Sequence, residues 1–347
     1  MSLPTSLRDI NPFQVAAIAA PLLAYLLWQP LPRPKKLLIH ASIPRRADDK
    51  SALVRRFREV YPEDYFEGGG YAALPHGKTH YYLLGPENAP KVVLICGLVT
   101  PAPIFSGLIK HLVKDFRVLL YDHYGRGYSD APETEYTDLL YCTQIALLMQ
   151  YVGWEKTHIV GVSMGGGIAA AFGAMFPKLI LGKVVMIAPA GLLKNEDYDL
   201  KGKIIAHPVG EYIASSSIVR WYLGRKPVSV GNPGATASMA AAFADIVTTA
   251  QLQQVMLPYH IPAVSSTIRD GPLSGLESAF SELGANKDIA VLVFWGNADE
   301  VVPYKLSSEM LRRVPRAKLV TIDGEGHEII ATRADEIGTQ TRDFLLS

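Results

Sequence analysis

The 347-residue chain is predicted to fold as an α/β domain with a mostly parallel, doubly wound sheet. Short apolar and β-branched runs alternate with amphipathic stretches of helical length, and Gly or Asp bounds most of the runs. This alternation is typical of successive βαβ crossovers. Hydrophobic residues make up 49% of the chain, enough for one large core with an insertion.

The order of the elements supports this fold class. Strands are expected at residues 80–84, 92–96, 118–122, 158–162, 184–188, 291–295 and 319–322. Helices are expected at residues 105–114, 134–152, 164–176, 304–313 and 334–346. Between residues 192 and 287 helical apolar patterns continue without a clear strand, and such a block is too long for an ordinary connection. We interpret it as a helical insertion that packs as a cap.

The amino-terminal region differs from the rest of the chain. Residues 13–28 carry no charge, although the stretch is shorter than the roughly 20 residues that span a bilayer. Basic residues follow it, which predicts that the carboxy-terminal bulk faces the cytosol; they are Arg33, Lys35, Lys36, Arg45 and Arg46. We therefore expect an N-terminal apolar helix and membrane association. Packing of this helix on protein is the alternative.

These patterns divide the chain into three parts. Residues 1–67 are expected to hold the apolar helix, a Pro-rich connector and a short surface helix, and residues 192–287 the cap. Residues 68–191 and 288–347 are expected to form the α/β core. A formal net charge of +1 disfavours nucleic acid as a partner. Cys96 and Cys142 are expected to be buried, reduced thiols, because no other Cys or His stands at metal-binding spacing.

The clearest local motif is Gly161-Val162-Ser163-Met164-Gly165, which joins an apolar run to an Ala-rich helical stretch. A G-x-S-x-G sequence between strand and helix is typical of a nucleophile elbow, whose tight turn requires glycine on both sides of the serine. Ser163 is therefore the expected nucleophile. Its place at a helix amino terminus puts backbone N–H groups beside a developing oxyanion.

A serine nucleophile needs a histidine base and an acid that orients the histidine. Asp299 follows the strand expected at 291–295, and His327 follows the strand expected at 319–322. Open α/β sheets place their catalytic groups at the carboxyl ends of strands, so we expect Asp299 and His327 to complete a triad with Ser163. Glu300 and Asp122 are alternative acids.

With these three segments, the chain from about Gly68 to Ser347 resembles the α/β-hydrolase superfamily. Residues 122–130, Asp-His-Tyr-Gly-Arg-Gly-Tyr-Ser-Asp, are similar to the family's D-x-R-G-x-G-x-S loop, and residues 268–273 to its cap-exit segment. The resemblance implies the α/β-hydrolase fold, a helical cap over the site, a serine hydrolase of the esterase or lipase kind, and no metal or organic cofactor. It also implies that Arg126 and Ser129 are structural.

The oxyanion loop departs from the family pattern. Many members have His-Gly where this chain has Cys96-Gly97-Leu98-Val99-Thr100-Pro101. The backbone N–H groups of Leu98 and Met164 are expected to form the oxyanion hole, and backbone donors need no particular side chain. A hydroxyl contribution from Thr100 and a nucleophilic Cys96 are the alternatives.

The expected reaction is hydrolysis of an apolar, small-molecule acyl ester through an acyl-enzyme. Apolar residues in the cap favour such a substrate over a sugar or phosphate; they are Ile204, Ile205, Ile213, Ile218, Trp221, Tyr222, Leu223, Met239, Phe243, Met256 and Leu257. The same triad also serves C–C bond hydrolases and lyases, and a non-catalytic binding protein is a further alternative. Other histidines lack motif context and are expected at the surface or in the cap: His80, His111, His207 and His260.

Overall fold

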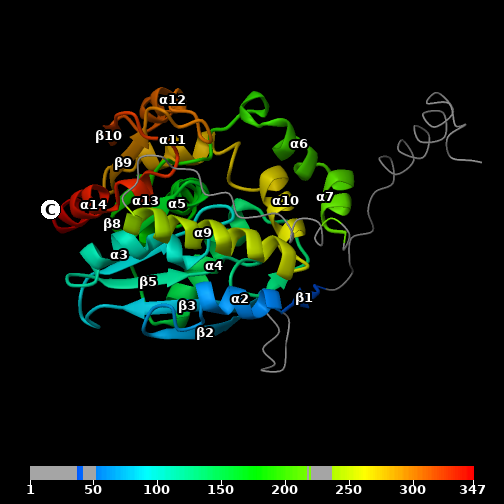
Figure 1. Ribbon diagram of the computed structural model, residues 1–347. Coiled ribbons are helices and arrows are strands. Elements are labelled where there is room, and N and C mark those ends of the chain that lie inside the picture. Colours follow the sequence, from blue (N-terminus) through cyan, green and yellow to red (C-terminus); the bar gives the residue numbers. More distant parts are fainter. Residues whose placement is uncertain (1–36, 42–51, 217–218, 220–236) are drawn as a thin grey trace, which may run out of the picture.

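The computed structural model describes residues 37–41, 52–216, 219 and 237–347. An eight-stranded sheet in the order β10-β9-β8-β7-β4-β5-β3-β2 forms its centre (Figure 1). The strands are β2 (Gly69–Leu74), β3 (Gly77–Leu84), β4 (Lys91–Ile95), β5 (Arg117–Tyr121), β7 (Thr157–Val162), β8 (Ile180–Ile187), β9 (Ala290–Gly296) and β10 (Lys318–Ile322). Strand β3 pairs antiparallel with β2 and β5, and the other neighbours pair parallel. The predicted fold class is confirmed.

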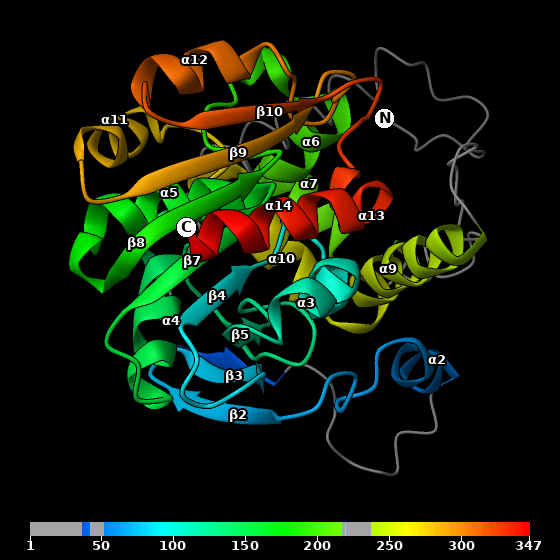
Figure 2. The ribbon, with the colours of Figure 1, turned by 90° about the vertical axis from the view of Figure 1, so that its left-hand side faces the viewer.

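Helices cover both faces of this sheet, which explains why its central strands are continuous apolar runs. In β4, Val93 and Ile95 belong to one hydrophobic cluster and Val92 and Leu94 to the other, as the period of two requires. The first cluster packs under α4 (Asp138–Tyr151), α5 (Met164–Met175), α11 (Glu277–Ala285) and α12 (Leu306–Arg313). The second packs under α3 (Ser106–Leu112) and α14 (Ala334–Leu346), which lie on the near face in Figure 2.

Short elements complete the core. Strands β1 (Ile39–His40) and β6 (Ala131–Pro132) form a separate antiparallel pair. The other short elements are η2 (Ala102–Phe105), η3 (Pro177–Leu179), η4 (Asn195–Asp197) and α13 (Ile329–Thr332). Of these, η2 and α13 lie in contact with each other, next to the segments that carry the site residues.

The core includes residues that precede Gly68 in the chain. Helix α2 (Ala52–Val60) buries Val54 and Phe57, and Tyr61 just after it is fully buried. The expectation of a core beginning at Gly68 after a surface helix is corrected, because residues 52–61 supply core side chains. Strand β2 was also not expected, since its first two residues are glycines, which strands disfavour.

The described elements between residues 192 and 287 are helices, and they pack in two different places. Helices α6 (Leu200–Ala206), α7 (Pro208–Ala214) and α10 (His260–Asp270) pack together, and the long α9 (Ala237–Met256) packs against α2 (Figure 1). Helix α11 packs instead against α5 and α12. It thus covers the sheet, and we place it with the core rather than with the cap.

The predicted apolar helix and Pro-rich connector fall outside the described residues, as do Ile218, Trp221, Tyr222 and Leu223. Within the described ranges, none of the helices combines the length and apolar character needed to cross a bilayer.

Candidate active site

Ser163 occupies a strained turn between β7 and α5. Its backbone has φ 55° and ψ −119°, a conformation that L-residues rarely adopt. A Cβ at Gly161 would lie 2.1 Å from the Gly165 carbonyl oxygen, and a Cβ at Gly165 would lie 2.1 Å from that of Ile95. The glycines of the motif are therefore required by close backbone approach.

The structure brings the three expected triad residues together. His327 Nε2 lies 2.9 Å from Ser163 Oγ, and His327 Nδ1 lies 2.8 Å from Asp299 Oδ2. The side chain of Asp299 is fully buried, and its Oδ1 accepts hydrogen bonds from the backbone N–H groups of Val301 and Val302. Because one carboxylate oxygen is held by the backbone, the other is aimed at the imidazole.

Hydrogen bonds hold the loops after β9 and β10 together. These bonds set the relative positions of Asp299 and His327. Asn297 donates to Asp323 Oδ1 at 2.9 Å and accepts from the Gly324 N–H at 2.8 Å. A Cβ at Gly296 would lie 2.2 Å from the Glu325 carbonyl oxygen. This close contact leaves no room for a side chain between the two loops.

The predicted oxyanion donors lie beside the serine. Met164 is the first residue of α5, and Leu98 lines the same cavity as Ser163. A Cβ built on Gly97 would be 3.5 Å from Ser163 Cβ, so the loop after β4 runs close beside the nucleophile. Thr100 Oγ1 accepts from the Gly97 N–H at 3.2 Å, a contact that holds the loop.

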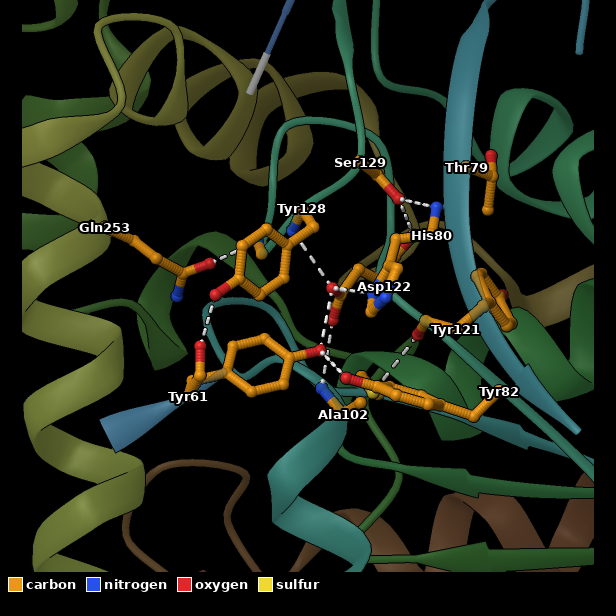
Figure 3. Close-up of polar contacts among 12 residues, drawn as sticks. Tyr61, Thr79, His80, Tyr82, Ala102, Tyr121, Asp122, Tyr128, Ser129 and Gln253 are labelled. Atoms are coloured by element: carbon orange, nitrogen blue, oxygen red, sulfur yellow. Dashed lines mark hydrogen bonds and ion pairs between the residues drawn. The ribbon is translucent and has the colours of Figure 1, made fainter. Parts of the chain in front are cut away.

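The alternative acids have other surroundings. Glu300 lines the cavity, whereas Asp299 holds the contact to His327. Asp122 is buried in a polar cluster, where its Oδ2 accepts from the Tyr61 hydroxyl and the Tyr128 N–H and lies 3.2 Å from His80 Nδ1 (Figure 3). The expectation that His80 lies at the surface or in the cap is therefore wrong, because its ring belongs to this buried cluster.

Both cysteines are buried and have no disulfide partner. Burial raises the pKa of the Cys96 thiol well above its usual value, and the charge of Asp122 raises it further. Burial likewise raises the pKa of Cys142. A protonated thiol is a poor nucleophile, so the geometry and the chemistry both favour Ser163.

A cavity of about 630 Å³ opens on the side of Ser163 and His327. Its wall combines core and cap segments and is mostly apolar; it includes Ile104, Leu193, Ile246, Ile268, Leu273 and Ile330. None of these side chains is among the site residues expected from the sequence, because none of them stands in a catalytic motif. In the part of the chain that the structure describes, no group of three or more metal-ligating side chains is arranged to hold an ion.

The chain is similar to known hydrolases in sequence. A family model described as alpha/beta hydrolase fold matches residues 90–203, and one described as TAP-like protein matches residues 269–347. The bifunctional esterase/perhydrolase DCH of Acinetobacter calcoaceticus is 24% identical, over 80% of this chain and 100% of its own. Rat monoacylglycerol lipase ABHD6 is 22% identical, over 97% of this chain and 95% of its own.

Solved structures share the fold. The carboxylesterase CesB of Bacillus subtilis superposes with a TM-score of 0.64 at 16% identity, covering 84% of this chain and 96% of its own. The sheet order, the elbow at Ser163 and the two family models point to one conclusion: the chain belongs to the α/β-hydrolase superfamily, and its relatives include an esterase/perhydrolase and a monoacylglycerol lipase.

Proposed function

We propose that the protein is a serine esterase that cleaves a carboxylic ester of an apolar small molecule through an acyl-enzyme. The observation that carries the proposal is the continuous hydrogen-bonded chain from Asp299 through His327 to Ser163 at the wall of an apolar cavity. This arrangement matches the requirements of nucleophile, base and orienting acid.

In the first half-reaction, His327 Nε2 takes the proton of Ser163 as its oxygen attacks the ester carbonyl. The backbone N–H groups of Leu98 and Met164 stabilise the oxyanion of the tetrahedral intermediate. His327 then gives the proton to the departing alcohol, and the acyl group stays on Ser163. Asp299 holds the imidazole tautomer and stabilises the imidazolium throughout.

In the second half-reaction, His327 takes a proton from water, which attacks the acyl-enzyme. As the second tetrahedral intermediate collapses, the bond between the acyl carbon and Ser163 Oγ breaks, and His327 returns its proton to that oxygen, which releases the acid and restores Ser163. The residues present supply every proton transfer in this cycle. An apolar cavity wall favours a substrate with an aliphatic or aromatic acyl group, because such groups gain free energy on leaving water.

The proposal includes association with a membrane, through the uncharged residues 13–28 and the basic residues that follow them. The basic flank supports a catalytic domain that faces the cytosol.

The test of the esterase proposal is labelling by a fluorophosphonate, which phosphonylates an activated serine. We expect Ser163→Ala to abolish labelling and to lower kcat on p-nitrophenyl esters by roughly six orders of magnitude. Ser308→Ala, a change of the same kind at an exposed serine on α12, should keep both. Labelling that persists in Ser163→Ala, or that never occurs in the wild type, would contradict the proposal.

A further inference from the structure

The backbone of the oxyanion loop, residues 96–100, is held by side chains from other segments. His123 Nε2 donates to the Cys96 carbonyl at 3.1 Å, and Arg126 Nε donates to the Leu98 carbonyl at 3.0 Å. Both donors come from the loop after β5, and both side chains are buried. This loop therefore fixes two of the carbonyl directions around the N–H of Leu98.

The next carbonyl is held from the cap. Gln253 is fully buried on α9, and its Nε2 donates to the Val99 carbonyl at 3.0 Å. Its Oε1 accepts from the Gly127 N–H at 2.6 Å. Figure 3 shows this side chain reaching from α9 towards the loop that carries Tyr128. One carboxamide thus joins a cap helix to the oxyanion loop and to the loop after β5.

A second connection runs from the cap through Arg126. Its Nη2 donates to Thr267 Oγ1 of α10 at 2.9 Å, while its Nε holds the Leu98 carbonyl. Arg126 is fully buried and lies over the rings of Tyr136 and Tyr141. Two cap helices therefore reach two consecutive carbonyls of the oxyanion loop, one directly and one through an arginine.

We infer that Gln253 is a positioning residue. Through it, the cap helix α9, packed in its place against the core, sets the direction of the Leu98 N–H in the oxyanion hole. Each carbonyl shares a rigid peptide plane with the N–H of the next residue. The peptide that carries the Leu98 N–H therefore lies between the held peptides of the Cys96 and Leu98 carbonyls, and Gln253 fixes the peptide that follows them. An oxyanion donor stabilises the transition state only when it is preorganised at short distance. The inference rests on the proposed function.

Gln253 does not line the cavity, so its effect should appear in the chemical step rather than in substrate binding. Loss of an interaction that acts only in the transition state lowers kcat and kcat/KM equally and leaves KM unchanged. The loss should also be independent of acyl length, because every ester places the same oxyanion in the hole. A displaced cap would instead change KM, and by amounts that depend on the acyl group.

The experiment compares the full-length wild type with Gln253→Met, Gln253→Glu and Gln254→Met, using p-nitrophenyl acetate and p-nitrophenyl octanoate. Gln253→Met removes both contacts at nearly constant length. Gln253→Glu keeps the oxygen that accepts from Gly127 but turns the donor to Val99 into an acceptor that the Val99 carbonyl repels, so it gives a second test if the first variant folds poorly. Gln254→Met makes the same chemical change at the neighbouring, only partly buried position of α9. Melting temperatures report on folding.

Both Gln253 variants should lose about tenfold or more in kcat on both esters, with KM unchanged, since small misplacement of catalytic groups is costly. Their affinity for a trifluoromethyl ketone, which forms a tetrahedral adduct on the serine, should fall by the same factor as kcat/KM. Gln254→Met should match the wild type. A folded Gln253→Glu with wild-type kcat, or a loss confined to KM or to one ester, overturns the inference. A wild-type chain whose Ser163 is not labelled by fluorophosphonate overturns both the inference and the proposed function.

Discussion

Asp299 and Glu300 are neighbours in the sequence, yet their carboxylates have different surroundings. Asp299 is buried, accepts two backbone hydrogen bonds and faces His327, whereas Glu300 is exposed at the edge of the cavity. A carboxylate orients an imidazole only through a direct hydrogen bond. The pair therefore offers two matched substitutions that separate the orienting acid from a nearby charge.

We expect Asp299→Asn to lower kcat by about 10⁴-fold, because an amide favours the wrong tautomer of His327. Glu300→Gln should leave kcat within a few-fold of the wild type. Steady-state kinetics on p-nitrophenyl butyrate measure both. The reverse ranking would assign the acid to Glu300.

His260 at the start of α10 shows how a single buried ring links stability to pH. Burial lowers its pKa to about 3, and the charge of Arg126 lowers it further. The folded protein therefore leaves this ring neutral while the unfolded chain binds a proton near pH 6.5. The titration of His260 therefore adds no pH dependence to stability well above pH 6.5, and it destabilises the fold increasingly as the pH falls from 6.5 towards 3.

Between pH 7.5 and 5.5 the wild type should lose on the order of 1 kcal/mol more of its unfolding free energy than His260→Gln. Urea unfolding at the two pH values gives both differences. His207→Gln, at an exposed histidine of the cap, is the control and should follow the wild type. An equal loss in His260→Gln would show that the ring is protonated in the folded state.

At the scale of elements, α2 and the turn after it are tied to the core by a buried carboxylate. The Tyr61 hydroxyl donates to Asp122 Oδ2 at 2.9 Å, and the Ala102 N–H at the start of η2 donates to Asp122 Oδ1 at 3.1 Å. Asp122 thus joins α2, β5 and the segment just after the oxyanion loop (Figure 3). A buried acceptor that loses its donor keeps its desolvation cost.

A chain that begins at residue 50 should therefore fold, whereas one that begins at residue 68 should be unstable or insoluble. In the full chain, Tyr61→Phe should cost about 1–3 kcal/mol of unfolding free energy. Tyr65→Phe is the matched control, since that hydroxyl pairs with Ser106 in a partly buried setting rather than with a buried carboxylate. Circular dichroism and thermal melting report the outcome. A stable, active chain from residue 68 would show that α2 is dispensable.

At the scale of the whole molecule, the apolar residues 13–28 are expected to attach the catalytic domain to a membrane. The full chain should pellet with membranes and resist a carbonate wash, and a chain from residue 50 should be soluble and active. Burial of this stretch contributes several kcal/mol at roughly 25 cal/mol per Å² of apolar surface.

Leu23→Lys provides the control for this prediction. A charge in the middle of the stretch costs about 3 kcal/mol in a bilayer, so this variant should shift towards the soluble fraction. A full chain that stays soluble at physiological salt would instead favour packing of the apolar residues on protein.

The local signals in the sequence determined the fold class and the motif that contains Ser163. Glycines at 161 and 165, an apolar run before them and a helix-forming run after them predict a strand, turn and helix without knowledge of the rest of the chain. The order of Ser163, Asp299 and His327, each after a predicted strand, could also be inferred, because parallel strands end at one edge of a sheet.

Only the tertiary structure decided which distant side chains meet. Tyr61 hydrogen-bonds to Asp122, and Gln253 hydrogen-bonds to Val99. Helix α11 packs on the helices of the core and does not belong to the cap. None of these contacts leaves a local pattern in the sequence. Residues 251, 253 and 254 are all glutamine, for example, and only burial in the folded chain distinguishes Gln253 from the other two. Propensity and periodicity describe neighbours along the chain, whereas the support of the oxyanion loop arises from contacts between residues 27 to 154 positions apart.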